Sequence, residues 1–273
     1  MNHATKQRGR LLAFAASGWI AAVWIAGCAG GRSTAVPQAA PSPATPRISG
    51  FDATVLQPVQ PVVLFVETFN RLDDERWKPV EVRGSTRYTV DVLEGNAVLK
   101  AASRAGASML VAPLRVRLDA QTWLSWRWRV DQPVAGENLR EKRRSDAAAR
   151  VYVFFNTKGF PWQKRQLDYV WSSALPEGTV LTSPCSRAAR IIVVAGSGEH
   201  LGRWQTVRRN VLSDYRRCFG QEPPEVVGIG VMTDTDNTGR DALAYYDDVT
   251  WRRESPDPLS TPETPPPAAA PAP

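Results

Sequence analysis

The stretch TWLSWRWRV, from Thr122 to Val130, decides the fold class of this chain. Side chains of a β-strand point alternately to its two faces, so this stretch separates into two sets. One set carries two arginines in mid-strand, and the other is apolar throughout: Leu124, Trp126, Trp128 and Val130. A strand with one apolar and one polar face is typical of a sheet that covers a core on one side. We therefore expect a strand here, with its tryptophans Trp126 and Trp128 in the core.

The same period of two recurs between residues 61 and 253 and marks further strands. They span residues 62–69, 88–103 (a hairpin turning at Glu94, Gly95 and Asn96), 108–116, 148–156, 167–173, 189–197, 226–234 and 243–253. About nine or ten short strands separated by turns predict an all-β domain, a β-sandwich or jelly roll. One short helix is expected where Val211, Tyr215 and Phe219 share a helical face, and Gly220 would end it.

Several long motifs, in this order along the chain, resemble one bacterial family. They are ASMLVAPLRV (107–116), LSWRWRV (124–130), DAAARVYVFF (146–155), LDYVWSS (167–173), RNVLSDYRRCFG (209–220), GIGVMTDTDNTG (228–239) and AYYDDV (244–249). By these motifs the chain is similar to the domain of unknown function 3047, from Val62 to Trp251. The resemblance implies an exported all-β domain with the architecture of carbohydrate-binding jelly rolls. It implies no particular activity.

The N-terminus has the pattern of an export signal. An uncharged apolar run, residues 11–25, follows three basic residues, Lys6, Arg8 and Arg10. The next residues, Ala-Gly-Cys28, resemble a bacterial lipobox, whose cysteine becomes the lipidated first residue of the mature protein. An ordinary secretory signal or a short membrane anchor would share the apolar run, which is short for a spanning helix. We expect a lipoprotein signal peptide over residues 1–27, a lipid on Cys28, and, because Ala29 follows, sorting to the outer membrane.

Proline-rich stretches flank the predicted β-sandwich domain, residues 61–253. Residues 28–60 predict a disordered tether, and residues 254–273 predict a disordered tail rich in proline and alanine. Removal of residues 1–27 takes away three basic residues and no acidic ones, so the formal charge falls from +7 to +4. This weak and diffuse charge does not indicate nucleic acid as a partner.

The numbers of cysteines and histidines limit which disulfides, metal sites and catalytic sites the mature chain can form. With a lipid on Cys28, Cys185 and Cys218 remain, and an even pair in an oxidising compartment favours a disulfide. The alternative is two buried thiols. His200 is the one histidine of the mature chain, because His3 leaves with the signal. Zinc sites built from two or three histidines are therefore excluded, and a catalytic triad would have to use His200.

The acidic stretch DTDNTGRDALAYYDD, Asp234 to Asp248, admits three interpretations. Asp234, Asp236, Thr238 and Gly239 match the start of an EF-hand-like calcium loop, but Tyr245 stands where the bidentate glutamate belongs. Alternatively, residues 235–242 turn a hairpin between two strands. Finally, many jelly-roll modules hold calcium between their first and last strands, and Asp247 and Asp248 would then point to opposite faces. Ca²⁺ is thus a candidate ion, with the candidate ligands Glu67, Asp234, Asp236 and Asp247.

A candidate binding face combines aromatic rings with groups that form strong hydrogen bonds. Sugars are bound in this way, because their C–H faces stack on rings and their polar groups meet arginine and aspartate. The candidate ligand-binding residues are Arg127, Arg150, Tyr152, Asp168 and Trp171. The alternative is structural, with the rings in the core and the arginines paired to carboxylates. A slip of one residue in the register would reverse the faces.

Together these features favour a membrane-anchored lipoprotein whose jelly-roll-like domain binds a glycan of the cell envelope or its surroundings. One alternative is a glycoside hydrolase or lyase. Asp168, Asp234 and Asp236 could supply the two carboxylates that such an enzyme needs. The Glu-x-Asp-x-x-Glu strand motif that concanavalin-like hydrolases often show is missing from the sequence, and no catalytic residue is assigned. The other alternative is a structural or assembly partner of another envelope protein, which would expose an apolar patch.

Overall fold

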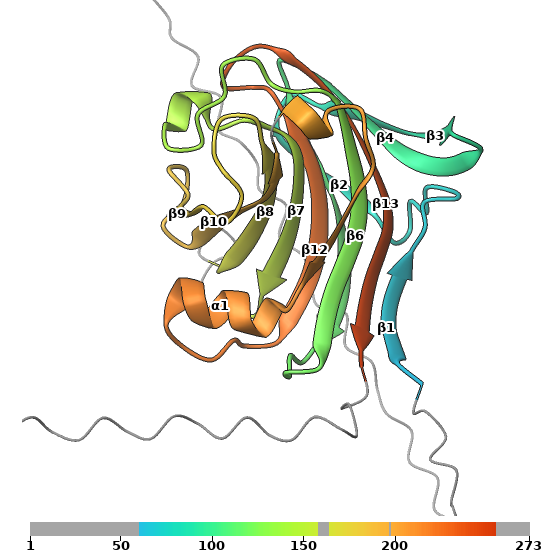
Figure 1. The fold of residues 1–273 in the computed structure, drawn as a ribbon, viewed down its shortest axis with the longest axis vertical. Coiled ribbons are helices and arrows are strands. Elements are labelled where there is room, and N and C mark those ends of the chain that lie inside the picture. Colours follow the sequence, from blue (N-terminus) through green and yellow to red (C-terminus); the bar gives the residue numbers. More distant parts are fainter. Residues whose placement is uncertain (1–59, 158–163, 197, 255–273) are drawn as a thin grey trace, which may run out of the picture. The chain divides into compact units, whose positions relative to one another are not determined.

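The computed structural model describes residues 60–157, 164–196 and 198–254. Two β-sheets face each other and one short helix, α1, lies at one end of them (Figure 1). The predicted all-β sandwich is therefore confirmed. The predicted signal peptide with Cys28, the tether through residue 59 and the tail from residue 255 lie outside the described ranges.

The first sheet, here sheet A, is six-stranded and contains both the first and the last strand. Its order is β11 (Gln205–Arg209), β6 (Thr122–Gln132), β13 (Asp241–Arg253), β4 (Asn96–Arg104) and β3 (Thr86–Leu93), with β1 (Val62–Glu67) also paired to β13. Glu94 and Gly95 have positive φ angles of 56° and 83° at the predicted turn between β3 and β4. That backbone conformation is typical of a two-residue hairpin turn.

The second sheet, sheet B, is seven-stranded. Its order is β2 (Lys78–Arg83), β5 (Ala107–Val116), β12 (Val226–Asp234), β7 (Ala147–Phe155), β8 (Gln166–Ser172), β10 (Ala189–Gly196) and β9 (Val180–Thr182). β8 and β10 run parallel, and the other described strand pairs are antiparallel. The central strands of this sheet carry the candidate site described below.

The described residues form thirteen strands, three more than the upper sequence-based number. Every predicted strand is present, and the three that were missed are β2, β9 and β11. These three lie at the outer edges of the two sheets. An edge strand packs against one neighbour, so its residues need not alternate between buried and exposed. All six residues of β2 are exposed, which left no periodic signal to find.

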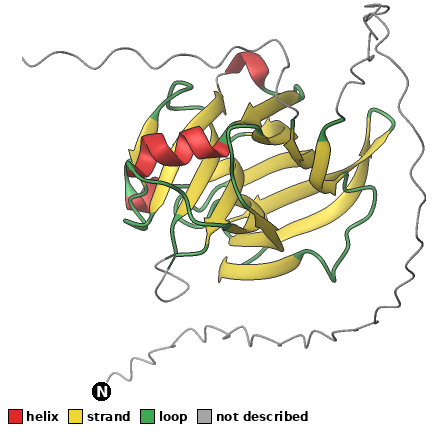
Figure 2. Ribbon diagram, turned by 90° about the horizontal axis from the view of Figure 1, so that it is seen from below, coloured by secondary structure: helices red, strands yellow, loops and turns green. Residues whose placement is uncertain are grey.

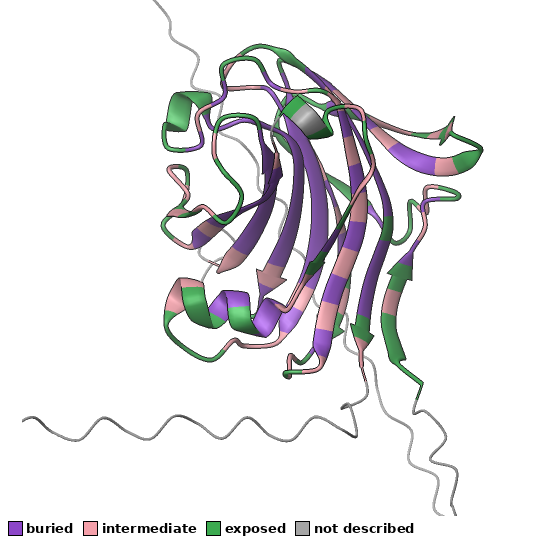
Figure 3. Cartoon of the chain, viewed as in Figure 1, coloured by how far each residue is buried: buried purple, intermediate pink, exposed green. Residues whose placement is uncertain are grey.

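The core lies between the sheets, and β6 contributes to it as predicted. Figure 3 shows β6 as alternating buried and half-buried bands, which correspond to its apolar and polar sets. Trp126 packs edge-on against Trp128 at 5.4 Å between ring centroids, and it meets Tyr169 of β8 at 5.3 Å. Burial of such rings contributes roughly 1.5–3 kcal/mol per side chain to folding. The prediction that Trp126 and Trp128 belong to the core is confirmed.

The predicted helix, α1, spans Val211–Phe219 (Figure 2). Asn210 caps its N-terminus by accepting a hydrogen bond from the backbone N–H of Ser213 at 2.9 Å. Gly220 ends it in the left-handed conformation, with φ of 66°, and its N–H donates to the carbonyl of Arg216. Tyr215 packs on Phe155 of sheet B at 4.5 Å. No helix in the described part of the chain has the length and the apolar character that crossing a bilayer requires.

Candidate ligand-binding face

The outer face of sheet B carries a patch of aromatic, apolar and charged side chains. Val151, Val153 and Phe155 of β7 belong to the main core, so the residues between them point to the opposite face. We call this patch the β7–β12 face and define it by Arg150, Tyr152, Phe154, Gln166, Asp168, Gly228, Gly230, Met232 and Asp234. Tyr152 and Met232 form a separate apolar cluster there, with Met109 and Phe154 packed against it.

Two parallel aromatic rings form the apolar part of this face. The rings of Tyr152 and Phe154 are stacked at 5.8 Å between centroids, with an interplanar angle of 7°. Glycine on the neighbouring strand makes room for them, because a Cβ on Gly230 would lie 3.2 Å from the Phe154 ring. The Tyr152 hydroxyl donates to the Met232 sulfur at 3.4 Å, which fixes the tyrosine ring. Tyr152 is buried and Phe154 is partly exposed, so Phe154 is the ring of this pair that a ligand could contact with a C–H face.

Asp168 lies beside these rings with an unsatisfied oxygen. The antiparallel pairing of β7 and β8 places Asp168 opposite Tyr152, and Gln166 opposite Phe154. Asp168 is only 3% exposed, and its Oδ1 has no hydrogen-bond partner among the described residues. Burial, partly offset by the charge of Arg150, raises the pKa of Asp168 to about 7. Since buried carboxylate oxygens are almost always paired, this oxygen marks a place on the face where a hydrogen-bond donor is missing.

Arg150 is held beside Asp168 by an ion pair. Its Nε donates to Asp234 Oδ1 at 2.8 Å, and its Nη2 donates to the Ser145 carbonyl at 2.7 Å. Asp234 also accepts a hydrogen bond from the backbone N–H of Ala147. Burial disfavours the charge of Arg150, but Asp234 outweighs this effect and holds the pKa of Arg150 well above its usual value. The guanidinium therefore stays charged and fixed.

The five sequence-predicted ligand residues do not share one face. Arg150, Tyr152 and Asp168 lie together on the β7–β12 face. Arg127 lies on the outer face of sheet A, where it pairs with Asp247 and stacks on Trp204, with its guanidinium carbon 5.0 Å from the ring centroid. Trp171 is 1% exposed in the main core, and its Nε1 donates to Gln205 Oε1 at 3.1 Å.

Sequence reasoning did not assign five members of this face a role: Phe154, Gln166, Gly228, Gly230 and Met232. Alternation already placed Phe154 on the same side of its strand as Tyr152. The missing information was that β12 lies next to β7, which brings the glycines and Met232 under the rings. A pairing between strands more than seventy residues apart leaves no local signal in the sequence.

The acidic stretch connects the two sheets. The interpretation of residues 235–242 as the turn of a hairpin is therefore wrong. β12 belongs to sheet B and β13 to sheet A, so the turn between them crosses from one sheet to the other. Asp146 caps this turn. Its Oδ1 accepts from the backbone N–H and side-chain amide of Asn237, and its Oδ2 accepts from the N–H and hydroxyl of Thr238.

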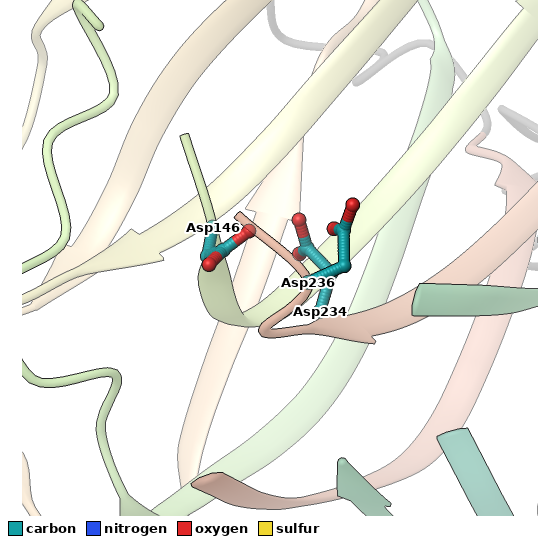
Figure 4. Close-up of side chains that lie close together, drawn as sticks. All are labelled: Asp146, Asp234 and Asp236. Atoms are coloured by element: carbon teal, nitrogen blue, oxygen red, sulfur yellow. The ribbon is translucent and has the colours of Figure 1, made fainter. Parts of the chain in front are cut away.

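The predicted metal ligands lie in three separate networks. Asp234 and Asp236 meet Asp146, and one carboxylate oxygen from each lies within 4.8 Å of the others (Figure 4). Glu67 instead accepts from the N–H of Phe69 and from the indole N–H of Trp77, both at 2.9 Å. Asp247 accepts from Asn96 and Arg127 on the outer face of sheet A. Asp146 was not among the predicted ligands, and these contacts give the carboxylates partners within the chain.

Cys185 and Cys218 are free cysteines in the structure, so the disulfide suggested by their number is not formed. Cys185 is exposed in the connection between β9 and β10, and Cys218 is half-buried in the last turn of α1. Burial raises the pKa of both thiols, which keeps them protonated near neutral pH.

The geometry thus defines an all-β sandwich protein with a candidate ligand-binding face on its seven-stranded sheet. The chain belongs to the family described as Protein of unknown function (DUF3047), whose model matches residues 75–250. No curated protein matches the chain.

Several solved structures are similar in outline. The family 11 carbohydrate-binding module of Lic26A-Cel5E from Clostridium thermocellum is 11% identical, with a TM-score of 0.37 over 71% of this chain and 95% of the module. The CBM22-1 xylan-binding domain of Xyn10C from Paenibacillus barcinonensis is 11% identical, with a TM-score of 0.37 over 72% and 97%. The cellulose induced protein Cip1 is 9% identical, with a TM-score of 0.42 over 68% and 96%. At these scores the likeness carries no argument about what this chain binds.

Proposed function

We propose that this chain is a glycan-binding protein and that the β7–β12 face is its binding site. The observation that carries the proposal is the parallel ring pair of Tyr152 and Phe154 beside the unpartnered Oδ1 of Asp168. A sugar ring has an apolar C–H face and a rim of hydroxyl groups. The Phe154 ring, supported from behind by Tyr152, would stack on the C–H face, and Asp168 and Gln166 would hydrogen-bond to the hydroxyl groups.

The proposal includes a lipid anchor on Cys28 that holds the domain at the bacterial envelope, on the outer membrane. It rests on the order of basic residues, apolar run and cysteine at the N-terminus. The proline-rich stretch 28–60 would then separate the binding domain from the membrane surface. Metabolic labelling with radioactive palmitate tests this part, because Cys28→Ser should abolish labelling. Unchanged labelling of the Cys28→Ser protein would rule out this anchor.

The binding proposal is tested with a glycan array and two matched aromatic variants. Phe154→Ala removes a half-buried ring from the β7–β12 face and is expected to weaken binding about two- to tenfold, since a stacked ring contributes about 0.5–1.5 kcal/mol. Trp123→Ala removes a half-buried ring from the outer face of sheet A, where it stacks with Arg208, and is expected to leave binding unchanged. Equal binding by wild type and Phe154→Ala would refute this location.

A hydrolase is the second candidate, because two buried carboxyls, those of Asp168 and Asp234, lie on the β7–β12 face. The raised pKa of Asp168, about 7, is that of a carboxylic acid able to donate a proton near neutral pH. Asp234, on the same face, supplies a second carboxylate. Release of reducing ends from any glycan that binds, lost in Asp168→Asn, would establish this activity. Stable binding without release would leave the protein a binder.

A further inference from the structure

The charged groups of the β7–β12 face restrict which sugars it can accept. Three buried ionisable groups lie together there: the carboxyls of Asp168 and Asp234 and the guanidinium of Arg150. The other groups that face Asp168 are uncharged, namely Tyr152 opposite it on β7 and Gln166 on its own strand. On β10 the paired residue is the apolar Ile191. With both carboxyls ionised, these three groups carry an excess of one negative charge, and the buried carboxylate of Asp146, beside Asp234, adds to it.

Arg150 does not present a free fork for an acidic ligand. Its Nε and Nη2 both reach Asp234, and Nη2 also donates to the Ser145 carbonyl. A ligand carboxylate that takes two hydrogen bonds from this guanidinium would have to displace Asp234 or the Ser145 carbonyl from Nη2. Loss of Asp234, which is itself buried, would leave its charge unpaired. Breaking a buried pair in this way costs several kcal/mol.

Asp168 Oδ1 is, in contrast, an acceptor that lacks a donor. It is buried, and Phe154 and Gln166, the neighbouring pair on the same face of β7 and β8, are both partly exposed. A hydroxyl or ammonium group placed there would satisfy the oxygen, whereas a carboxylate would add a second negative charge where water is excluded.

We propose that the ligand of this face is a neutral or amino sugar chain that donates a hydroxyl or ammonium hydrogen to Asp168, and that chains of uronic acids are rejected. This inference rests on the proposed glycan-binding function. It adds the class of sugar that is bound and makes Asp168 the residue that distinguishes neutral or amino sugars from uronic acids. Arg150 does not bind the ligand, because it is paired with Asp234.

The test is an array of neutral, glucosamine-containing and uronic chains of matched length, probed at pH 7.5 with the intact protein. Binding is expected for neutral or glucosamine-containing chains, with uronic chains at least tenfold weaker. Preferred binding of uronic chains would overturn the inference and leave the glycan-binding function standing. Absence of binding to all three classes would overturn both.

Two matched variants then locate the discrimination. Asp168→Asn removes the charge with little change of shape, and it is expected to weaken the best ligand and to reduce the gap to uronic chains to less than threefold. Asp91→Asn makes the same change at an exposed carboxylate of sheet A, where Asp91 pairs with Lys100, and is expected to keep the wild-type pattern. An unchanged gap in folded Asp168→Asn would overturn the role of Asp168.

Discussion

Arg127 of β6 and Asp247 of β13 form an ion pair on the outer face of sheet A, with 2.6 Å between Nη2 and Oδ2. The next carboxylate, Asp248, reaches the same guanidinium at 2.8 Å. Regular alternation would put these consecutive aspartates on opposite faces, as the sequence predicted. A β-bulge overrides it: Asp248 has φ of 51°, and the pairing of β13 with β6 shifts between Asp247 and Thr250.

Arg127→Ala is therefore expected to act on stability. Asp247 is fully buried, and removal of Arg127 leaves its charge with only Asn96 and a backbone N–H as partners. Because the arginine side chain is 33% exposed, we expect a loss of about 1–3 kcal/mol in urea unfolding, less than for a fully buried pair. The control Asp248→Asn changes a 51% exposed carboxylate and should alter stability by less than about 0.5 kcal/mol. A stable Arg127→Ala protein with lost glycan binding would instead assign Arg127 to ligand binding.

Trp171→Ala is expected to destabilise the domain by about 3–5 kcal/mol, because it empties the space of a large ring in the main core. Thermal and urea unfolding measure this loss directly. Trp123→Ala, on the outer face of sheet A, is the matched control and should cost less than about 1 kcal/mol. Wild-type stability of Trp171→Ala would contradict the packing described for β8.

Gly230→Val should displace the Phe154 ring. Even a single Cβ at this position would lie 3.2 Å from that ring and 3.3 Å from the Leu110 carbonyl oxygen, and valine adds two methyl groups. We expect glycan binding to fall at least as far as in Phe154→Ala, with a stability loss of about 1–3 kcal/mol from overpacking. Gly228→Ala, whose Cβ would make contacts of 3.4 Å or more, is the milder control. Full binding by Gly230→Val would show that the ring is not needed.

The pH dependence of stability should report on Asp168. Its folded pKa of about 7 lies above its ordinary value of 3.8, so the folded state binds this proton more tightly than the unfolded state. Stability contributed by the proton is present below the unfolded pKa and is lost as the pH rises toward 7. Between pH 5 and pH 8 the wild type should therefore lose about 2–3 kcal/mol relative to Asp168→Asn. Parallel urea titration curves for the two proteins would contradict the raised pKa.

Removal of calcium should leave the melting temperature unchanged. Asp146 already accepts four hydrogen bonds from Asn237 and Thr238, and Asp234 is paired with Arg150. An ion would have to replace these partners. Scanning calorimetry compares the melting temperature in about 2 mM EDTA with that in about 2 mM CaCl₂, a concentration above the dissociation constants of weak extracellular calcium sites. If calcium raises the melting temperature of the wild type but not that of Asp236→Asn, an ion is bound at this turn.

Strong local patterns predicted the elements of the fold well. The two faces of β6 were assigned correctly because its side chains alternate without interruption. Helix α1 was found through its apolar face and Gly220. β2 was missed because all six of its residues are exposed, and β9 and β11 were missed because they have only three and five residues.

The candidate site was predictable only in part, because it depends on which strands are neighbours. Alternation put Arg150 and Tyr152 on one face, and the structure adds Asp168 through the pairing of β7 with β8. Arg127 and Trp171 have the same residue types as sugar-binding side chains, yet they lie on the other sheet and in the core. The bulge at Asp248 and the crossing from sheet B to sheet A after β12 depend on backbone geometry, which cannot be predicted from the residue types.

The order of the strands along the chain has a consequence for when the two sheets can form during synthesis. The two last strands are interior members of the two sheets: β12 separates β5 from β7, and β13 separates β6 from β4 and β1. Sheet B cannot be completed before β12 has been synthesised, and sheet A cannot be completed before β13. The sandwich is therefore completed only near the end of synthesis, when strands far apart in the sequence come together.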